Sequence, residues 1–516
     1  MNRRRFLNVV GWGAAAQCGR AALHAPAPAR PNIVVLLADD LGYGDVNLAV
    51  PGVSAFRNPY IRTPHLAALA AESIVFTHHY SASPVCSPSR AGLLTGRTPT
   101  RANIDLWIND LKDNDRMFLS GKEVTIAELL RQAGYSTAVF GKWHLNGADW
   151  EQKSNWTGWT GSFPAQQGFD YGLVTKENPH LTRELKLNSQ ENPGDYFHLD
   201  GTPAGELKGF SSAIIVDRAI EWLRAGRDKS RPFFLYLPFD AVHEIISSPL
   251  EFTRLYDTGN PNKDAYYANV TFLDAQVGRF VKALDSMGMG ENTVVLFSSD
   301  NGPDELNCNN LTARSFGTSY PLFGQKRQVF EGGIRVPGIL RWKARVGPRV
   351  SDFPNYTPDL LPTFCEAAGV RPPSDRTLDG ISLLSHWLEN ARPKRKTPMY
   401  WHFEKQALNW EMTGEGYDRR FDGTRRSKAP VPHVAIRRDN FVLLGYQEGK
   451  PYGMPDRYEL FDVVADPEEK TDLSRLKPEI FKSMVGELEA THASVMRDRE
   501  TRAKEIQARV DQRSRR

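Results

Sequence analysis

The stretch NIVVLLA at residues 32–38 is an uninterrupted apolar run that ends at two acidic residues, Asp39 and Asp40. Short apolar runs rich in β-branched residues are typical of strands that are buried on both faces of a parallel sheet. Similar runs recur at Tyr135 to Gly141, Phe233 to Pro238 and Thr293 to Ser299. Each run predicts a buried strand of one common sheet.

Helical patterns separate these runs. Thr63-Pro64 predicts the start of a helix that continues through Ser73, because proline is favoured in the first turn of a helix. Further helices are expected at Val124 to Ala133, Ser212 to Arg224 and Ala265 to Leu284. This alternation indicates the α/β class, with a large, mostly parallel sheet sandwiched by helices.

Polar side chains follow four of the predicted strands, at the point where each strand ends. They are Asp39 and Asp40, Lys142 and His144, His243, and Asp300 and Asn301. In open α/β sheets, ligands bind in a crevice beyond the carboxyl ends of the strands. We therefore expect these residues to converge on one site.

The 516-residue chain is long enough for more than one domain. The basic stretch NARPKRKT at residues 390–397 is typical of a linker, and alternating apolar segments follow it at Met399 to Phe403, His433 to Ile436, Asn440 to Leu444 and Tyr458 to Asp462. We predict a large domain over residues 31–392 and a smaller C-terminal domain over residues 393–516, with an antiparallel sheet and a helix from about Pro478. The charged tail beyond Arg497 predicts a solvated helix end.

The charge of the chain is unevenly distributed. The formal net charge is +4, but Arg3, Arg4, Arg5, Arg20 and Arg30 all lie in the first 30 residues, which contain no acidic residue. The rest of the chain carries nearly equal numbers of basic and acidic residues, so it lacks the basic surface that nucleic-acid binding needs. Any anion must be bound by a local site.

The first 30 residues have the features of an export signal. Arg3-Arg4-Arg5 precedes a short apolar stretch, Asn8 to Ala16, and resembles the paired arginines of twin-arginine signals. The apolar stretch is too short to span a bilayer, and no later apolar run reaches about 18 residues. We expect a protein exported to the periplasm or the extracellular space, with no membrane span.

Three cysteines remain after this signal, Cys86, Cys308 and Cys365. An odd number leaves at least one thiol outside any disulfide framework, and whether Cys308 and Cys365 pair stays open. One cysteine can therefore be kept for chemistry.

Residues 84–97 read PVCSPSRAGLLTGR, which contains Cys-x-Pro-Ser-Arg followed by Leu-Thr-Gly-Arg, and residues 134–144 read GYSTAVFGKWH. These two motifs resemble the two signatures of the type I, formylglycine-dependent sulfatases. The resemblance extends to Asp39-Asp40, to Asp300-Asn301-Gly302, to Gly324-Gln325-Lys326 with Glu331-Gly332-Gly333, and to Tyr458-Glu459-Leu460-Phe461-Asp462. It covers essentially the whole chain after the signal.

This resemblance implies an alkaline-phosphatase-like fold and the hydrolysis of sulfate monoesters. It also implies that a maturation enzyme oxidises Cys86 to formylglycine, whose hydrate, a gem-diol, attacks sulfur. The aldehyde reforms when sulfate leaves, which a serine at this position could not achieve. The family's roles fall on Arg90, which holds the hydrated aldehyde; Lys142 and Lys326, which contact sulfate; His144, which deprotonates the gem-diol; and His243, which protonates the leaving alcohol. The segment Ala241 to Ile245 lacks the prolines that commonly flank this last histidine.

The acidic residues at the strand ends predict a metal site. Asp39, Asp40, Asp300 and Asn301 offer only oxygen ligands, which suit a hard cation and argue against zinc. Two adjacent carboxylates also repel one another and need a counter-charge. One calcium ion is therefore expected, as in similar sulfatases, with the oxidised side chain of Cys86 as a further ligand.

The substrate is expected to be a sulfated carbohydrate, from the habit of the family and from export. Trp150, Trp156 and Trp159 could stack on sugar rings, or could belong to a local core. Two alternatives stay open. One is a phosphatase or phosphonate hydrolase of the same fold, and the other is a non-catalytic protein that binds sulfated glycans. The sequence leaves the oligomeric state open.

Overall fold

The computed structural model describes residues 30–50, 53, 56, 58–108, 117–146, 163–175, 194–207, 209–243, 246–304, 316–403, 431–447 and 453–514. The predicted export signal, the tryptophans Trp150, Trp156 and Trp159, and Cys308 therefore lie outside the described residues, apart from Arg30. None of the described helices combines the length and the apolar character that crossing a bilayer requires.

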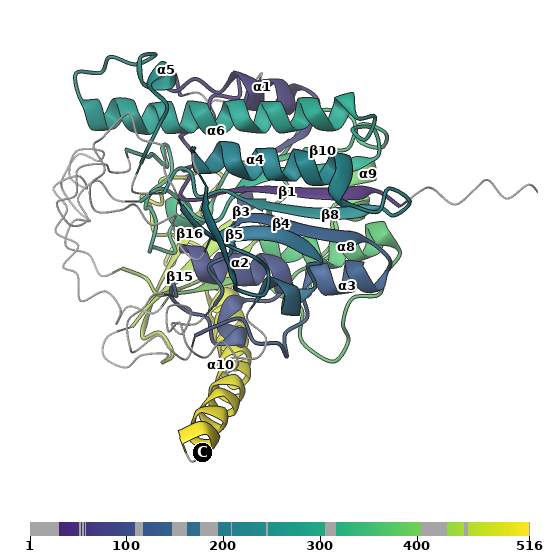
Figure 1. Ribbon diagram of the computed structural model, residues 1–516. Helices are drawn as coiled ribbons and strands as arrows, with labels where there is room; N and C mark the ends of the chain where they lie inside the picture. Colours follow the sequence, from purple (N-terminus) through teal and green to yellow (C-terminus); the bar gives the residue numbers. More distant parts are fainter. Residues whose placement is uncertain are drawn as a thin grey trace, which may run out of the picture.

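A ten-stranded mixed sheet forms the centre of the larger part of the molecule (Figure 1). In spatial order its strands are β11 (Arg349–Ser351), β2 (Ile74–Phe76), β10 (Gly338–Arg341), β9 (Thr293–Ser299), β1 (Asn32–Ala38), β8 (Phe233–Pro238), β4 (Ser136–Lys142), β5 (Tyr171–Thr175), β6 (Gly194–Phe197) and β7 (Pro203–Leu207). The central strands β9, β1, β8, β4 and β5 are parallel, whereas the pairs that involve β10, β6 or β7 are antiparallel. All four predicted strands are present, as neighbours in the parallel centre.

β1 is buried on both faces, as its apolar run predicts. Val34 and Leu36 belong to one hydrophobic core, and Ile33 and Val35 belong to another on the opposite face of the sheet. Successive side chains of a strand point to opposite faces. An alternating sequence could therefore not fill both cores, and a continuous apolar run can.

Helices cover both faces of the sheet (Figure 1). One side carries α1 (Pro64–Ala71), α4 (Ser211–Glu221) and α6 (Pro261–Ser286), and the other carries α2 (Cys86–Thr95), α3 (Ile126–Gln132) and α8 (Leu360–Ala368). The shorter elements are α5 (Leu250–Thr253), α7 (Glu331–Ile334), α9 (Leu384–Glu389), a π-helical turn at Trp222–Gly226, and 3-10 turns at Pro99–Ala102 (η1), Pro164–Gln167 and Thr357–Asp359. The expected helix at Ser212 to Arg224 is thus α4 followed by the π-helical turn. A two-stranded parallel ribbon joins β3 (His79–Tyr80) to β12 (Asn355–Tyr356).

The start of α1 is capped from outside the helix. Thr63 lies at the N-cap, but its hydroxyl bonds to the backbone of Asn47 rather than to its own helix. The carboxylate of Asp274 on α6 instead accepts the backbone N–H groups of His65 and Leu66, at 3.1 and 2.6 Å. Orphan N–H groups of a buried helix start require such partners. The helix begins at the predicted proline, and a distant residue caps it.

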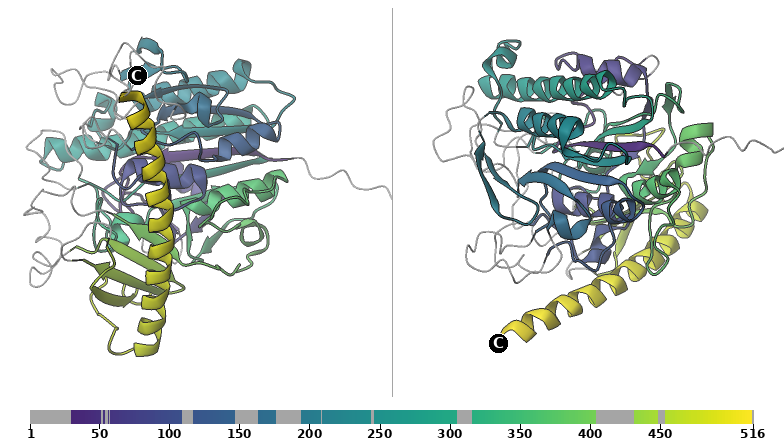
Figure 2. Two further views of the ribbon diagram at one scale, coloured as in Figure 1. Left: turned by 90° about the horizontal axis from the view of Figure 1, so that it is seen from below. Right: turned by 45° about the vertical axis from the view of Figure 1, so that its right-hand side comes forward.

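A four-stranded antiparallel sheet and a long helix form the C-terminal part (Figure 2). The strands are β13 (Met399–His402), β14 (Val434–Arg438), β15 (Phe441–Tyr446) and β16 (Arg457–Asp462), and the helix is α10 (Pro478–Ser514). Met484, Leu488 and Val495 of α10 pack on one face of this sheet. The predicted small sheet and its helix are confirmed, whereas the domain boundary at residue 392 stays a prediction.

The expectation of a solvated helix end beyond Arg497 is wrong for the first turn of that tail. Asp498, Arg499 and Arg502 form ion pairs with Arg97, Asp105 and Glu123 of the larger part. The side chains of Arg499 and Arg502 are only 19% and 12% exposed. Charge in a sequence shows that a residue needs polar partners, and these partners are other side chains as well as water.

The other face of the small sheet packs against the segment that precedes α2. Trp401 is fully buried between the rings of Tyr80 and Tyr356. Its indole N–H donates to the carbonyl of Ser81 at 2.7 Å. Val85, the residue before Cys86, belongs to the same core. The C-terminal sheet therefore supports the start of α2.

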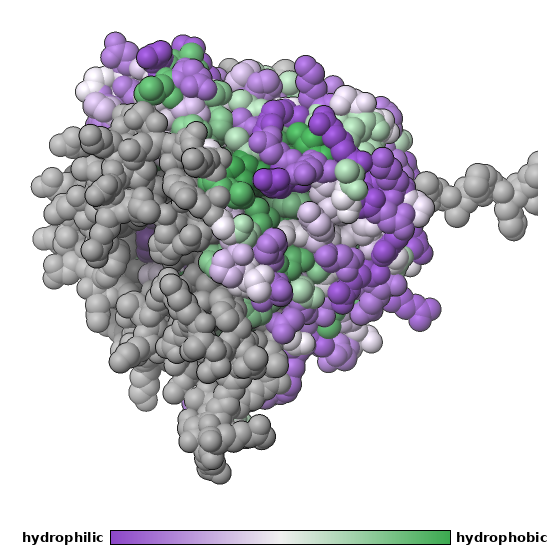
Figure 3. Space-filling view, in the orientation of Figure 1, coloured by the Kyte–Doolittle hydropathy of each residue, from purple (hydrophilic) through white to green (hydrophobic). Residues whose placement is uncertain are grey.

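The described surface that faces the viewer in Figure 3 is mostly hydrophilic, with apolar patches of limited extent. Such a distribution is ordinary for a folded protein, because polar groups cannot cover a whole surface. No binding surface is assigned from it.

Trp401→Ala should lower the free energy of unfolding by about 3 to 5 kcal/mol, since it leaves a cavity where the small sheet packs against the segment before α2. Trp401→Phe keeps most of the ring but leaves the buried carbonyl of Ser81 without this donor, at a cost of about 1 to 3 kcal/mol. Denaturant-induced unfolding measures both. Equal stability of the alanine variant and the wild type would show that the contact between the small sheet and the segment before α2 contributes nothing to the free energy of unfolding.

Candidate active site

The polar residues predicted at the strand ends lie together at the carboxyl edge of the sheet. Backbone hydrogen bonds join these ends: Asp39 N–H donates to Ala241 O at 2.9 Å, and Asp300 N–H donates to Ala38 O at 3.1 Å. Asp40 adopts the left-handed region, with a φ of 60°. A non-glycine residue in this region is uncommon and directs the chain sharply out of the strand. The parallel register thus brings the ends of β1, β8 and β9 into one site.

Cys86 is the first residue of α2, and its side chain is buried. Its thiol donates to Asp39 Oδ1 at 3.6 Å. The start of a helix presents free N–H groups and a partial positive charge, which favour an anion. Burial raises the pKa of the Cys86 thiol well above its usual value, although Lys142 and Lys326 oppose the shift. The unmodified thiol is therefore a poor nucleophile.

Arg90 lies one turn into α2, and its guanidinium is completely buried. Its Nε and Nη2 donate to Asp300 Oδ2 at 3.0 and 2.7 Å, and its Nη1 donates to the carbonyl of Lys142 at 2.7 Å. Nη2 also lies 3.3 Å from Asp39 Oδ2. One side chain thus links the ends of three strands.

The two predicted lysines each contact one of the paired acids. Lys142 Nζ donates to Asp39 Oδ2 at 2.5 Å, and Lys326 Nζ donates to Asp40 Oδ2 at 2.7 Å. Burial alone would raise the pKa of Asp39, but Lys142, His243 and Arg90 together lower it well below its usual value. These cations stabilise the charged form of the acid.

Asp300 is a buried carboxyl group with a raised pKa. Burial is the largest cause that raises its pKa to about 7, followed by the negative charge of Asp39, and Arg90 opposes both. Several carboxylates that crowd together in this way repel one another unless a cation lies between them. The raised pKa of Asp300 therefore reflects burial next to other carboxylates, which Arg90 offsets only in part.

Four side chains that could bind a metal ion lie close together among the described residues. Ligand atoms of Asp39, Asp40, Cys86 and His243 all lie within 4.8 Å of one another. Asn301 directs Nδ2 to Asp40 Oδ1 at 2.7 Å, while its carbonyl Oδ1 is buried without a hydrogen-bond partner. Such an unpaired oxygen is costly unless something else coordinates it. Together with the carboxylates it provides the oxygen ligands that calcium prefers.

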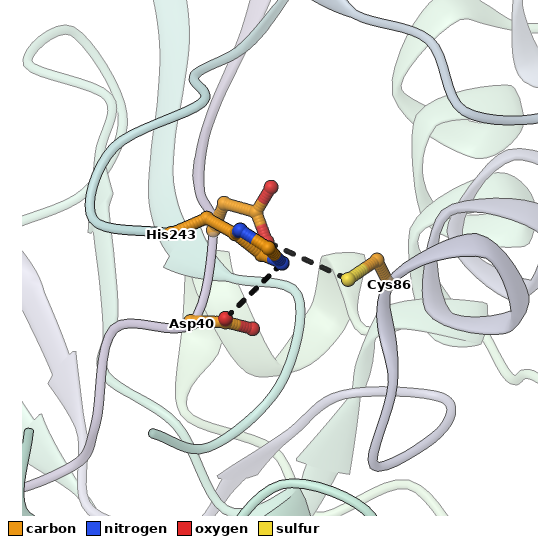
Figure 4. Close-up of side chains that lie close together, drawn as sticks. Asp40, Cys86 and His243 are labelled. Carbon is orange, nitrogen blue, oxygen red and sulfur yellow. Dashed lines mark hydrogen bonds and ion pairs between the residues drawn. The ribbon is translucent and has the colours of Figure 1, made fainter. Parts of the chain in front are cut away.

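His243 approaches the acids from the side opposite Cys86 (Figure 4). Its Nε2 lies 3.6 Å from Asp40 Oδ2. Its side chain is 12% exposed, whereas the side chains of Asp40 and Arg90 are fully buried. A proton donor to a leaving group must be reachable by the substrate, and the position of His243 meets this requirement.

His144 follows β4, with a φ of 53°. Its Nε2 donates to the carbonyl of Ile108 at 2.7 Å, which leaves Nδ1 as the basic nitrogen. Burial lowers the pKa of His144 well below its usual value, and the positive charges of Lys142 and Arg90 act in the same direction. The ring is therefore neutral, as a general base must be.

The sequence interpretation did not include Asp304 and Arg327. Asp304 is buried and accepts from Lys326 Nζ at 3.3 Å and from the guanidinium of Arg327. Asp304 lies four residues after Asp300, and Arg327 directly follows Lys326. Proximity in sequence to predicted site residues was the available signal. It is weak, because an acid or a base in a loop is usually exposed.

The fold and the site together define a class of enzyme. A large parallel sheet presents an oxygen-rich cation site, a helix start with residue 86, and three buried cations. This arrangement suits the hydrolysis of esters whose central atom carries several oxygens, because fixed cations stabilise the charge that those oxygens share.

The sequence model of the family called Sulfatase matches residues 31–370. The chain therefore belongs to the sulfatase family, and it is a sulfuric ester hydrolase. The resemblance drawn from the two motifs is confirmed.

Two similar proteins illustrate the range of this family. N-acetylgalactosamine-6-sulfatase of Canis lupus familiaris is 32% identical over 434 residues, which cover 79% of this chain and 78% of the relative. The ulvan-active sulfatase of Formosa agariphila is 29% identical over 490 residues, which cover 90% of this chain and 80% of the relative.

Solved structures share the fold. Ps i-CgsB in complex with k-i-k-neocarrahexaose has a TM-score of 0.70 at 24% identity, and covers 90% of this chain and 93% of its own. The phosphonate monoester hydrolase of Agrobacterium radiobacter has a TM-score of 0.60 at 19% identity, and covers 90% and 96%. The fold alone therefore does not distinguish the two chemistries.

A calcium ion that binds only the folded state should stabilise the chelator-treated protein by about 2.7 kcal/mol at 100 times its dissociation constant. Asn301→Ala removes an unpaired ligand oxygen and should shift this stabilisation to higher calcium concentration. Thermal unfolding across a calcium titration measures both effects. Asn269→Ala is the matched control, because Asn269 is a buried amide on α6 outside the site. An identical calcium response in both variants would contradict the assignment of Asn301.

Proposed function

We propose that this protein is an exported sulfatase that removes sulfate from carbohydrates, using formylglycine at position 86 and one calcium ion. One observation carries the proposal: Cys86 begins a helix beside Asp39, with Arg90, Lys142 and Lys326 buried in the same cluster. The sequence motif around Cys86 and this placement agree on the same nucleophile.

Asp39, Asp40, Asp300 and Asn301 would hold the calcium ion, together with the oxidised side chain of residue 86. When bound, calcium supplies positive charge that acidifies a hydroxyl and neutralises developing negative charge. The residues themselves fix its place, because Arg90 holds Asp300 and Asn301 donates to Asp40.

The oxidised residue 86 supplies, as its hydrate, a hydroxyl nucleophile that can later release sulfate by reforming a carbonyl. Arg90 orients this residue, because both belong to α2 and the guanidinium is fixed by two hydrogen bonds to Asp300. Lys142 and Lys326 bind the oxygens of the sulfate group. Each ammonium lies beside a carboxylate, so it stays charged in the buried site.

Two histidines would move protons in this reaction. His144 accepts a proton at Nδ1, because Nε2 donates to Ile108. His243 donates a proton from the exposed side of the site to the leaving alcohol. Their positions on separate strand ends keep the two proton transfers apart.

The carbohydrate substrate is supported by the similar proteins, two of whose names refer to N-acetylgalactosamine and ulvan, and by a similar structure solved in complex with k-i-k-neocarrahexaose. Export is supported by the arginine-led N-terminal segment. A formylglycine-generating enzyme is required as a partner during maturation. A phosphatase or phosphonate hydrolase of the same fold remains the second enzyme function, because a phosphonate monoester hydrolase shares the fold.

Cys86→Ala should abolish turnover without unfolding the protein, because it removes the nucleophile and leaves the strands intact. Cys86→Ser should accept sulfate once and stop, since a serine ester has no carbonyl to reform. Intact-mass measurement should show one retained sulfate on the serine variant, and formylglycine in the matured wild type. Multiple turnovers by the alanine variant would refute the mechanism.

His243→Ala should slow the hydrolysis of sugar sulfates by roughly 100-fold or more, because their alcohols leave poorly without a proton. An aryl sulfate with an acidic phenol should lose much less activity. Equal losses in kcat on both substrates would show that His243 only positions the substrate.

Sulfate esters should be hydrolysed much faster than phosphate esters of the same alcohol. A phosphate monoester carries nearly twice the negative charge, and a one-metal site has no second ion to offset it. Initial rates on matched ester pairs decide between the two enzymes. Faster phosphate hydrolysis would favour the alternative function.

A further inference from the structure

A short loop after η1, residues 104–108, connects several parts of the active site. We call it the bridging loop. The backbone N–H of Ile108 donates to Ser87 Oγ at 3.0 Å, and its carbonyl accepts from His144 Nε2 at 2.7 Å. Ser87 is the neighbour of the nucleophile position, and His144 is the proposed base. The backbone of Ile108 therefore hydrogen-bonds both to the residue after the nucleophile position and to the proposed base.

The bridging loop also contacts the segment that contains Lys326. The guanidinium of Arg327 lies over the ring of Trp107, 5.5 Å from its centroid. Arg327 follows Lys326, and its backbone N–H donates to the carbonyl of Pro84 at 2.9 Å. A displacement of the loop would therefore be felt on both sides of the site.

Asp105 connects this loop to the C-terminal part. Its side chain is buried, and its Oδ2 accepts from Arg499 Nε of α10 at 2.7 Å. Its Oδ1 lies 3.7 Å from His402 Nδ1 on β13. The anchor thus joins the loop to both elements of the C-terminal part. In Figure 2, α10 runs from the small sheet along the body of the molecule.

The pairing of Asp105 with Arg499 has an energetic reason to persist. Burial alone would raise the pKa of Asp105, but His402 and Arg499 lower it, so the carboxylate is charged. Loss of Arg499 would leave the buried Asp105 carboxylate beside His402 at 3.7 Å, and a buried charge that loses a partner tends to move toward water. That movement would displace the backbone three residues before Ile108.

We infer that Asp105, held by Arg499 of the C-terminal helix, is a positioning residue that sets the place of His144 through the bridging loop. This inference rests on the proposed function, because His144 acts there as the base. The C-terminal helix thereby contributes to catalysis without touching the substrate.

Arg499→Met should lower kcat by roughly 10- to 100-fold, because a misplacement of about 1 Å at a catalytic group has effects of this size. KM should change less than kcat, because Lys142 and Lys326 keep their ion pairs with Asp39 and Asp40. Arg499→Lys restores the charge and should recover part of the loss. Asp105→Asn, which removes the charge from the other side, should lower kcat in the same way.

Arg502→Met is the matched control. Arg502 lies three residues further along α10 and pairs with buried Glu123 at 2.7 Å, with a similar exposure to Arg499. Glu123 precedes α3, and its carboxylate pairs with Arg97, Arg376 and Arg502, which all lie outside the bridging loop. This variant should lose comparable stability and keep its kcat.

The assay uses matured protein, with formylglycine content measured by peptide mass spectrometry, so that kcat refers to active sites only. The substrate is a sulfate ester that the wild type hydrolyses. Equal kcat losses in the 499 and 502 methionine variants, or no loss in either, would overturn the positioning role. A fully matured wild type that hydrolyses no sulfate ester would instead refute the proposed function.

Discussion

The guanidinium of Arg90 lies fully buried between the carboxylates that follow β1 and β9, and it also binds the carbonyl at the end of β4. Breaking such a buried ion pair typically costs about 3 to 5 kcal/mol, because the remaining charge has no water to solvate it. This constraint fixes the distance between α2 and the sheet. The place of residue 86, one turn before Arg90, follows from it. The cation site and the nucleophile are therefore positioned by the same contact.

The C-terminal part supports this site from outside. Its sheet packs against Val85 and holds Ser81 through Trp401, while α10 binds the bridging loop through Arg499. Both contacts end on segments that adjoin residue 86 or His144. The C-terminal part thus contacts the segments next to Cys86 and His144. The contact through Arg499 is ionic, and the contact through Trp401 is aromatic. Each can therefore be removed by mutation without removing the other.

The sequence predicted the residues that adjoin strands and signature motifs, since these lie within one or two positions of a recognisable element. Asp39, Asp40, Lys142 and Asn301 are of this kind. Asp304 was not predicted, because no periodicity distinguishes a buried acid in a loop from an exposed one. The cap of α1 by Asp274 was missed for a similar reason. Thr63 is a favourable cap locally, but its hydroxyl hydrogen-bonds to the backbone of Asn47 instead.

The sequence by itself determined the strands, the class of fold, the family motifs and the types of ligand atom, because each of these depends on neighbouring residues and on their chemistry. Only the tertiary structure decided which charged groups, far apart in the sequence, form ion pairs. The ion pair of Asp105 with Arg499 spans 394 positions, and the pair of Arg97 with Asp498 spans 401. Local pattern carries no information over such separations. Burial of Asp105 and of Arg97 makes a charged partner necessary, and burial is a property of the folded chain.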